Sequence, residues 1–313
     1  MKAVFLDRGS FPDYIQFNAP NNSLKIVEYA DTKTTNIVER ITDADIILVN
    51  KTVLTAEHLS QCKRLKMIQI TATGMNNVDL DYCSANNIVV NNVANYSANS
   101  VPEHAFSLLL NLKRNLGSYI SDVKKGKWSE STHFCFLDHP IKDLANSTML
   151  IVGSGNIGQN IARIAQAFGI KCLFSERRNA QTIREGRVSF EEGIKVADII
   201  TLHCPLTAEN RSLIGQQELR DMKSSALLLN VSRGGLVDEH ALIEAIKNNE
   251  ISGAAMDVAT VEPMPENHPL NQLSDYPNFI LTPHVAWASD EAMQTLSNLA
   301  MDQIKLFMLT HNA

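Results

Sequence analysis

The sequence predicts an α/β protein made of two doubly wound domains, each built on a parallel β-sheet. Short runs rich in valine and isoleucine alternate with amphipathic segments along almost the whole chain. Strands that alternate with helices form parallel sheets covered on both faces. The length of 313 residues, with 44% hydrophobic and 20% charged residues, is typical of globular chains and favours two domains over one core.

The first third of the chain predicts one such domain. Period and composition predict strands at residues 2–7, 24–29, 45–50, 65–70 and 87–92. The segments between them predict short helices at residues 34–41, 55–62 and 77–86. We therefore expect a parallel sheet within a unit of roughly 100 residues, a common domain size.

A long helix is expected to follow, over residues 100–126. Ser100 provides a hydroxyl at the start, Pro102 lies in the first turn, and Glu103 completes the pattern of a capping box. The polar segment 127–147 then connects this helix to the second half of the chain.

The second half repeats the alternation. Strands are predicted at residues 148–153, 171–175, 198–203, 226–231, 253–258 and 279–283, with helices notably at 157–168 and 238–249. An amphipathic helix at 289–309 belongs to neither run of strands and could return to the first domain. We expect residues 1–98 with 288–313 to form one domain and residues 99–287 the other.

Charge and hydropathy exclude several classes of function. The net charge of −6 and the pI near 5.9 provide no general field that would attract nucleic acid. No apolar run reaches the roughly 18 residues needed to cross a bilayer, and the acidic start does not resemble a secretory signal. We therefore expect a small-molecule partner, with no nucleic acid and no membrane.

The five cysteines indicate a cytoplasmic protein without a structural metal. They are odd in number and widely spaced, which is typical of reduced thiols rather than of a disulfide framework. His133, Cys135 and His139 form the tightest group of possible ligands, but a fourth ligand and a repeated Cys-x-x-Cys spacing are missing. We interpret them as loop residues.

The segment "GSGNIG", Gly153–Gly158, has the pattern of a dinucleotide-binding loop. It follows a predicted strand and opens a predicted helix, which assigns a task to each glycine. Gly153 makes the tight turn, Gly155 lets the backbone approach a pyrophosphate, and Gly158 packs the helix on the strand. A ligand-free glycine turn is the simpler alternative. We expect a Rossmann domain.

Glu176 follows the next strand, eighteen positions after Gly158, where a carboxylate would bind the hydroxyls of the adenosine ribose. A carboxylate there favours NAD because it repels a 2′-phosphate. Arg177 and Arg178 follow directly, however, and an arginine here would accommodate NADP. The prediction is NAD, with NADP possible.

Three charged or polar residues follow later strands of this domain, at the sheet edge where ligands bind. Arg233 has a planar fork that matches a carboxylate. The imidazole of His284 is suited to moving a proton near neutral pH. Glu262 could bind one ring nitrogen and set the tautomer. Alone, they could be a surface cation, a packed histidine and a turn residue.

Four ordered motifs, "GSGNIG", "VSRGGLVDE", "MDVATVEP" and "TPHVAW", resemble the D-isomer-specific 2-hydroxyacid dehydrogenases over nearly the whole chain. The resemblance implies catalytic roles for Arg233, Glu262 and His284, and a bond from Asp257 to the nicotinamide carboxamide. The segment "HCPLT" is similar to the loop on the adenine side. The cofactor-binding residues expected within these segments and motifs, besides the catalytic ones and those named above, are Asn156, Ile157, His203, Cys204, Pro205, Val231 and Ser232.

The first domain then resembles the substrate-binding, flavodoxin-like domain of this family. "TATGMNNVDLD" looks like the turn whose backbone N–H groups grip the substrate carboxylate, at Thr73, Gly74 and Met75. Together with "VNKTVL", which adds Asn50 and Lys51, it looks most like the glycerate dehydrogenases, or hydroxypyruvate reductases. The entry to the cofactor domain, residues 145–148, departs from the Gly-Lys-Thr pattern of relatives.

The resemblance implies hydride transfer between NAD(P)H and a small 2-keto acid, in a cleft between the domains. It also implies a homodimer formed through the cofactor domain, at the long helix and residues 127–140. The alternatives are a non-enzymatic NAD-sensing corepressor-like protein and another member of the family, such as a phosphoglycerate dehydrogenase. Glu262 disfavours a formate dehydrogenase, whose pattern resembles glutamine there.

Overall fold

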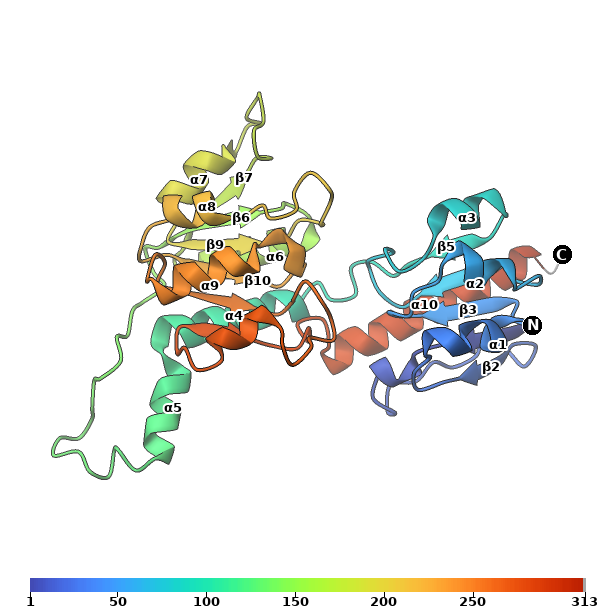
Figure 1. Ribbon diagram of the computed structural model, residues 1–313, viewed down its shortest axis with the longest axis horizontal. Coiled ribbons are helices and arrows are strands. Elements are labelled where there is room, and N and C mark those ends of the chain that lie inside the picture. The colour runs from blue at the N-terminus through green and yellow to red at the C-terminus, as the bar shows by residue number, and fades with distance from the viewer. Residues whose placement is uncertain (312–313) are drawn as a thin grey trace. The chain divides into compact units, whose positions relative to one another are not determined.

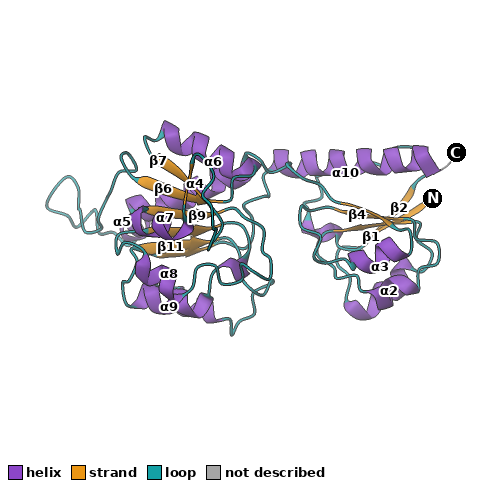
Figure 2. Cartoon of the chain, turned by 90° about the horizontal axis from the view of Figure 1, so that it is seen from above, coloured by secondary structure: helices purple, strands orange, loops and turns teal. Residues whose placement is uncertain are grey.

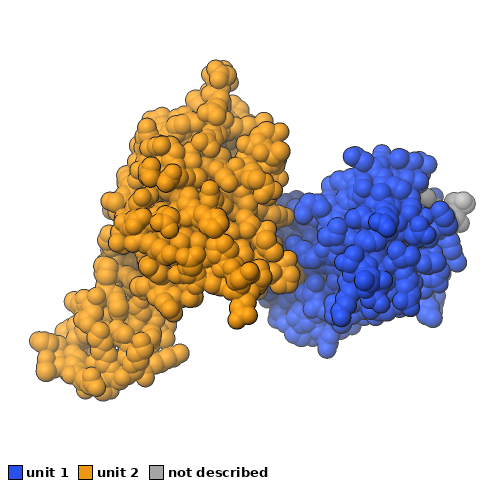
Figure 3. Space-filling model, viewed as in Figure 1, with its two compact units in different colours: residues 1–97, 288–313 blue, residues 98–287 orange. Residues whose placement is uncertain are grey.

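A computed structural model describes residues 1–311 of the protein, so the last two residues of the predicted 288–313 segment lie outside the described part. The chain forms two compact units, coloured separately in Figure 3. Unit 1 consists of residues 1–97 and 288–313, and unit 2 of residues 98–287. Figure 1 labels their helices and strands.

Unit 1 is built on five parallel strands in the order β2-β1-β3-β4-β5. The strands are β1 (Lys2–Phe5), β2 (Lys25–Glu28), β3 (Ile46–Val49), β4 (Met67–Ile70) and β5 (Val89–Asn91). This order is that of flavodoxin-like doubly wound sheets. β3 and β4 lie inside the sheet and every one of their residues is buried, which explains why all of them except Gln69 are apolar.

Helices cover both faces of this sheet. Figure 2 shows α2 and α3 on one face and α10 along the other. The helices are α1 (Ile37–Ile41), α2 (Ala56–Ser60), α3 (Leu80–Ala85) and α10 (Asp290–His311), with the short 3-10 turns η1 (Arg8–Ser10) and η2 (Thr34–Asn36). Gln303 of α10 accepts a hydrogen bond from Gln69 of β4 at 2.8 Å. The C-terminal helix is therefore part of unit 1.

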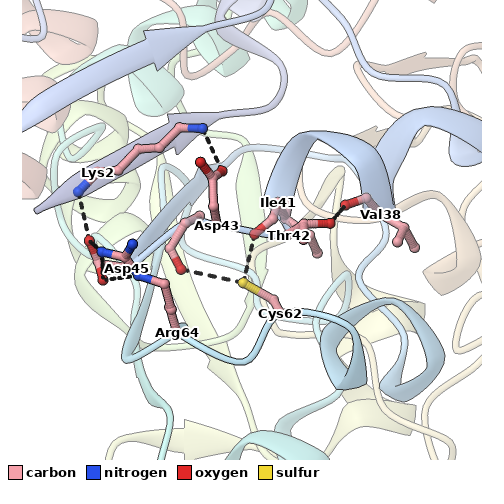
Figure 4. Close-up of polar contacts among 9 residues, drawn as sticks. Lys2, Val38, Ile41, Thr42, Asp43, Asp45, Cys62 and Arg64 are labelled. Atoms are coloured by element: carbon pink, nitrogen blue, oxygen red, sulfur yellow. Dashed lines mark hydrogen bonds and ion pairs between the residues drawn. The ribbon is translucent and has the colours of Figure 1, made fainter.

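The amino-terminal edge of the sheet in unit 1 is closed by structural polar contacts (Figure 4). The Asp45 carboxylate accepts hydrogen bonds from the backbone N–H of Lys2 at 2.8 Å and from Arg64 at 3.1 Å. The Cys62 thiol donates to the carbonyl of Ile41 at 2.7 Å. Since these groups bind one another, the opposite, carboxyl edge is where a ligand site is expected.

Unit 2 is built on seven parallel strands in the order β12-β11-β10-β9-β6-β7-β8. They are β6 (Thr148–Val152), β7 (Lys171–Ser175), β8 (Arg187–Val188), β9 (Ile199–Leu202), β10 (Leu227–Asn230), β11 (Gly253–Met256) and β12 (Phe279–Leu281). Counted from β6, this is the Rossmann order with one added strand. The predicted fold class is confirmed for both units, and only the two-residue β8 had no predicted counterpart.

The strands of unit 2 alternate between two hydrophobic cores. Met149 and Ile151 face the core formed with α4 (Ser100–Arg114) and α6 (Asn156–Ala167). Leu150 and Val152 face the core on the opposite side, formed with α7 (Phe190–Val196), α8 (Gln216–Asp221) and α9 (Glu239–Lys247). The remaining short elements of unit 2 are η3 (Gly234–Leu236) and η4 (Pro269–Leu273). Side chains alternate because successive residues of a strand point to opposite faces.

The prediction of one helix over residues 100–126 is wrong. Asn115 adopts a left-handed conformation, with φ of 49°, and separates α4 from α5 (Leu116–Lys124), which projects from unit 2 in Figure 1. Asparagine tolerates this conformation better than most residues. The predicted capping box is also wrong: the helix starts after Asn99, and the Ser100 hydroxyl donates to the carbonyl of Ala286 at 2.6 Å. A tertiary partner has replaced the local cap.

Candidate active site

The predicted segments of unit 2 all follow strands at the same edge of the sheet. Because the strands are parallel, their carboxyl ends meet at one edge, and β6 and β9 form the point where the strand order reverses. The predicted residues follow their strands in this way: the glycine loop after β6, Glu176 after β7, His203 after β9, Arg233 after β10, Asp257 after β11 and His284 after β12.

The glycine loop fits a bound pyrophosphate. Gly153 has a φ of 110°, and a Cβ there would lie 2.6 Å from the backbone of His203. A Cβ on Gly158 would lie 2.0 Å from the carbonyl oxygen of Gly153. Gly155, just before α6, faces open space. Space above the N-terminus of a twelve-residue helix, where backbone N–H groups are unpaired, suits an anionic phosphate.

A pocket of about 730 Å³ continues from this loop. Glu176 lines it, and the Arg184 guanidinium binds the Glu176 carboxylate through two hydrogen bonds, at 2.6 Å and 2.5 Å. The hydrogen bonds from Arg184 and from the backbone N–H of Arg177 lower the pKa of Glu176 to about 2. Cys204 and Pro205, both predicted, also line the pocket.

His203 is half-buried and has a hydrogen-bonding partner on β9, the strand that it follows. Its Nε2 atom lies 2.8 Å from the Thr201 hydroxyl, and burial lowers the pKa of the imidazole to about 3. The ring is therefore neutral at physiological pH. The backbone carbonyl of the next residue, Cys204, accepts a hydrogen bond from the Ser232 hydroxyl at 2.8 Å. This bond joins the ends of β9 and β10.

His284 and Glu262 form a hydrogen-bonded pair. His284 Nδ1 lies 2.6 Å from Glu262 Oε2, and Glu262 Oε1 accepts from the backbone N–H of Ala259 at 3.0 Å. The Trp287 indole donates to the carbonyl of His284 at 2.9 Å. The Nδ1 position is thus occupied by the carboxylate. Chemically, such a pair can deliver a proton from the other ring nitrogen, Nε2.

Asp257 anchors the turn that carries His284. Its fully buried carboxylate accepts hydrogen bonds from the backbone N–H groups of Val285 and Ala286, at 3.0 and 2.9 Å, and from the Thr282 hydroxyl at 2.5 Å. Burial alone would raise the pKa of Asp257, but the nearby His104 side chain and the hydrogen bonds from Thr282, Val285 and Ala286 outweigh burial and lower the pKa. Asp257 is therefore a charged anchor for the turn.

Arg233 lies on a segment that packs directly against the loop of Glu262. A Cβ on the next residue, Gly234, would lie 2.1 Å from the carbonyl carbon of Ala259. The Arg233 carbonyl accepts a hydrogen bond from the Asn230 side chain at 2.8 Å, which ties the turn to β10. The segments of Arg233, Glu262 and His284 are thus linked through direct contacts within unit 2.

The predicted substrate-binding residues of unit 1 lie after neighbouring strands of its sheet. Asn50 and Lys51 follow β3, and residues 73–75 follow β4. The Asp7 carboxylate accepts the backbone N–H groups of Asn50 and Lys51, both at 2.7 Å. The Thr73 hydroxyl donates to the carbonyl of Val93 at 3.0 Å. Both turns are therefore held in fixed conformations.

Comparison with known proteins identifies the family. The sequence profile of the D-isomer specific 2-hydroxyacid dehydrogenase, NAD binding domain, matches residues 106–286, more than half of the chain. The chain belongs to the D-isomer specific 2-hydroxyacid dehydrogenase family. Membership of this family makes the chain an NAD(P)-dependent oxidoreductase of 2-hydroxy acids. This confirms the prediction from the sequence motifs.

Individual relatives of this dehydrogenase cover nearly its full length. It is 42% identical to a glycerate dehydrogenase of Methylorubrum extorquens over 309 residues, 98% of this chain and 96% of the relative. The structure of a D-lactate dehydrogenase from Aquifex aeolicus, complexed with NAD and lactic acid, is similar with a TM-score of 0.85 and 28% identity, covering 99% and 96% of the two chains. An NADPH-dependent glyoxylate/hydroxypyruvate reductase from Sinorhizobium meliloti is similar with a TM-score of 0.84 and 26% identity, covering 98% and 94%.

Several site residues of this dehydrogenase were missed by the sequence motifs. Arg184 lies on the loop after Glu176 and Arg187 begins β8, beyond the two arginines that were predicted. His104 lies 3.4 Å from Asp257, and Glu239 accepts the backbone N–H of Thr260 at 2.7 Å. Glu239 is the last residue of the motif "VDE", which the sequence shows. Its partner Thr260 follows β11, and the two residues meet because β10 and β11 are neighbours in the sheet.

Two further findings concern function classes. Within residues 1–311, no group of three or more histidine, cysteine, aspartate or glutamate side chains is placed to hold a metal ion. None of the helices in that part of the chain is long and apolar enough to cross a membrane.

Proposed function

We propose that this dehydrogenase reduces a short 2-keto acid, hydroxypyruvate or glyoxylate, and oxidises D-glycerate in the reverse direction. The observation that carries the proposal is the 2.6 Å hydrogen bond between His284 and Glu262, in a turn anchored by Asp257. The similarity to a glycerate dehydrogenase and to a glyoxylate/hydroxypyruvate reductase supports the substrate class.

In this proposal each residue has one chemical task. The Arg233 guanidinium binds the carboxylate and carbonyl oxygens of the keto acid, because its fork offers parallel N–H donors. His284 donates a proton from Nε2 to the forming hydroxyl oxygen, while Glu262 holds Nδ1 and stabilises the imidazolium. When bound, the reduced nicotinamide coenzyme supplies the hydride to C2 of the substrate.

The remaining predicted residues complete the proposal. In unit 1, the backbone N–H groups of Thr73, Gly74 and Met75 hold the substrate carboxylate, with Asn50 and Lys51 beside the substrate. Asp257 is also proposed to bind the nicotinamide carboxamide, which requires its buried carboxylate to become accessible when the coenzyme binds. The other proposed contacts to the coenzyme come from Gly153, Gly155, Asn156, Ile157, Gly158, Glu176, Arg177, His203, Cys204, Pro205, Val231 and Ser232.

The direct test follows NADH and NADPH oxidation with hydroxypyruvate, glyoxylate, pyruvate and phenylpyruvate. We expect turnover with hydroxypyruvate and glyoxylate, the two acids of this set that lack an apolar side chain. His284→Ala should lower kcat by about 100-fold or more, the usual contribution of acid–base catalysis. His240→Ala, an exposed histidine of the same unit, should leave kcat unchanged. Normal turnover by His284→Ala would remove His284 from this role.

A second variant tests the guanidinium. Arg233→Lys keeps the positive charge but loses the planar fork, so KM for the keto acid should rise more than kcat falls. An unchanged KM would contradict the assignment of Arg233 to the substrate. If no keto acid oxidises either coenzyme although both coenzymes bind, the alternative of a non-enzymatic NAD sensor is favoured.

We also propose that this dehydrogenase forms a homodimer through unit 2. The arm, defined as α5 with residues 125–141, exposes apolar side chains at Leu116, Ile120, Val123, Trp128, Phe134, Leu137 and Ile141. Phe134 is 91% exposed, and such a cluster is typical of an interaction surface. A second copy of the chain is the occupant that the family resemblance implies.

Light scattering after gel filtration tests the dimer. The wild-type protein should have twice the 34.7 kDa mass of one chain. Phe134→Asp with Leu137→Asp should yield monomers, because burying two carboxylates in an apolar interface is costly. Val53→Asp, an exposed apolar position in unit 1, is the matched control. A wild-type monomer would contradict the proposal.

A cytoplasmic location completes the proposed function. All five cysteines are free thiols, and the reducing cytoplasm keeps thiols in that form.

A further inference from the structure

The carboxylate expected to bind the adenosine ribose is already covered by an arginine. Only 4% of the Glu176 side chain is exposed, whereas 61% of the Arg184 side chain is exposed above it. Arg184 contacts both carboxylate oxygens, through Nε at 2.6 Å and through Nη2 at 2.5 Å. The ribose hydroxyls of NAD would need these same two oxygens as acceptors.

The surroundings of this ion pair are rich in positive charge. The pocket is lined by four arginines and two glutamates, namely Arg177, Arg178, Arg184, Arg187, Glu176 and Glu209. Arg187 donates to the Ser154 hydroxyl of the glycine loop at 2.5 Å and to the Ser175 carbonyl at 3.0 Å, so its side chain is fixed beside the pocket. Arg178 pairs with Glu218.

The ion pair between Arg184 and Glu176 affects the binding of NAD and of NADP differently. An uncovered Glu176 would repel a 2′-phosphate. The bound Arg184 neutralises this carboxylate, and the outer side of the Arg184 guanidinium faces solvent. A guanidinium carries five N–H donors, and the two bonds to Glu176 use two of them. The others can bind a doubly charged phosphate in a charge-assisted manner while the pair stays intact. Ribose hydroxyls reach Glu176 only after Arg184 has moved.

We propose that Arg184 is the residue that selects the coenzyme, and that the pocket accepts NADP(H) as well as NAD(H). The Arg184 guanidinium contacts the 2′-phosphate of NADP(H) while it remains paired with Glu176. NAD(H) binds to the state in which Arg184 has left Glu176. This inference rests on the proposed function only in that the coenzyme's adenosine end occupies this pocket.

Binding of NAD⁺ and NADP⁺ without substrate, measured by isothermal titration calorimetry, tests the inference. Arg184→Ala should raise the Kd of NADP⁺ by about tenfold or more, the typical effect of losing a hydrogen bond to a charged group. The Kd of NAD⁺ should stay equal or fall, because Glu176 is uncovered. Arg184→Lys, which keeps the charge without the fork, should have an intermediate Kd for NADP⁺.

Matched controls separate Arg184 from a general effect of charge. Arg163→Ala removes an exposed arginine of α6 that does not line the pocket, and the ratio of the two Kd values should not change. The fragments 2′-AMP and 5′-AMP probe the same point without nicotinamide. Arg184→Ala should weaken 2′-AMP about as much as NADP⁺, whereas the Kd of 5′-AMP, like that of NAD⁺, should stay equal or fall. Circular dichroism verifies that each variant is folded.

Two results would overturn the inference. One is an unchanged ratio of Kd values in Arg184→Ala, and the other is a wild-type protein that binds NAD⁺ but does not bind NADP⁺ or 2′-AMP. Both leave the proposed 2-keto acid reduction intact, since NADH would still support it. Conversely, coenzyme binding as expected without turnover of any keto acid would contradict the proposed function and support the role of Arg184.

Discussion

Replacing Asp257 by asparagine is the most informative perturbation of the candidate site outside the proposed proton donor. Asp257 is fully buried, and its carboxylate accepts the backbone N–H groups of Val285 and Ala286. Asparagine has nearly the same shape but only one oxygen, so its NH₂ group faces one of these donors. One buried donor is then left unpaired, which costs about 1–3 kcal/mol in the free energy of unfolding.

The expected consequences can be measured separately. Urea unfolding should show the loss of about 1–3 kcal/mol, and the melting temperature should fall by roughly 2–4 °C per kcal/mol for a unit of this size. Hydrogen exchange at the amides of Val285 and Ala286 should become faster, because their acceptor is weakened. We expect kcat to fall because His284 is less firmly placed. Asp221→Asn, at a partly exposed position at the end of α8, is the control.

The pH dependence gives an independent measure. Since the pKa of Asp257 is lowered in the folded protein, its charge stabilises the fold above the ordinary value of about 3.8 and this contribution is lost as the pH falls through the lowered pKa. Asp257→Asn should remove that part of the acid-side loss. A variant within about 0.5 kcal/mol of wild type, the range of ordinary surface changes, with unchanged exchange at both amides would refute the anchoring role.

Three further predictions concern other buried contacts. Gly158→Ala places a Cβ 2.0 Å from a backbone oxygen of the glycine loop, so calorimetry should show at least about tenfold weaker NAD⁺ binding. The Cβ of Gly155→Ala would face open space, so this variant should retain a stable fold. The pKa of His203 is lowered to about 3, so between pH 7 and 5 the unfolded chain takes up a proton that the folded chain does not. The free energy of unfolding, measured with urea, should therefore fall by about 2 kcal/mol between pH 7 and 5. This fall should disappear in His203→Gln and should persist in His240→Gln. Asp7→Ala leaves three backbone N–H groups after β3 without their acceptor and should lower the free energy of unfolding by about 3 kcal/mol or more; a change under about 1 kcal/mol would show that water replaces the carboxylate.

Most strands were predictable because each corresponds to a local run of apolar residues in the sequence. The predicted strand at 171–175 coincides with β7, and ten other predicted strands contain the observed ones with a few extra residues at their ends. Strand ends are less certain because the last residues of an apolar run can leave the ladder and enter the loop, as Gly153 does. The two-residue β8 carries too short a pattern to be recognised.

The helix start at Ser100 and the helix break at Asn115 show where local rules fail. Both depend on competing interactions: Ser100 finds a distant carbonyl, Ala286, and Asn115 donates from its side chain to the carbonyl of Pro140 at 2.6 Å. A capping pattern predicts only that a hydroxyl can serve as a cap, and the tertiary fold decides whether a better partner is present.

By itself, the sequence determined which residue types follow each strand: a glycine loop, a carboxylate, an arginine and a histidine. These follow from periodicity and spacing, which act over a few residues. The tertiary structure alone decided their partners. His284 meets Glu262 across 22 positions of sequence, Asp257 holds the turn that carries His284, and Arg184 covers Glu176. Such pairs form because the order of parallel strands brings separate loops together at one edge, and no local pattern contains that order.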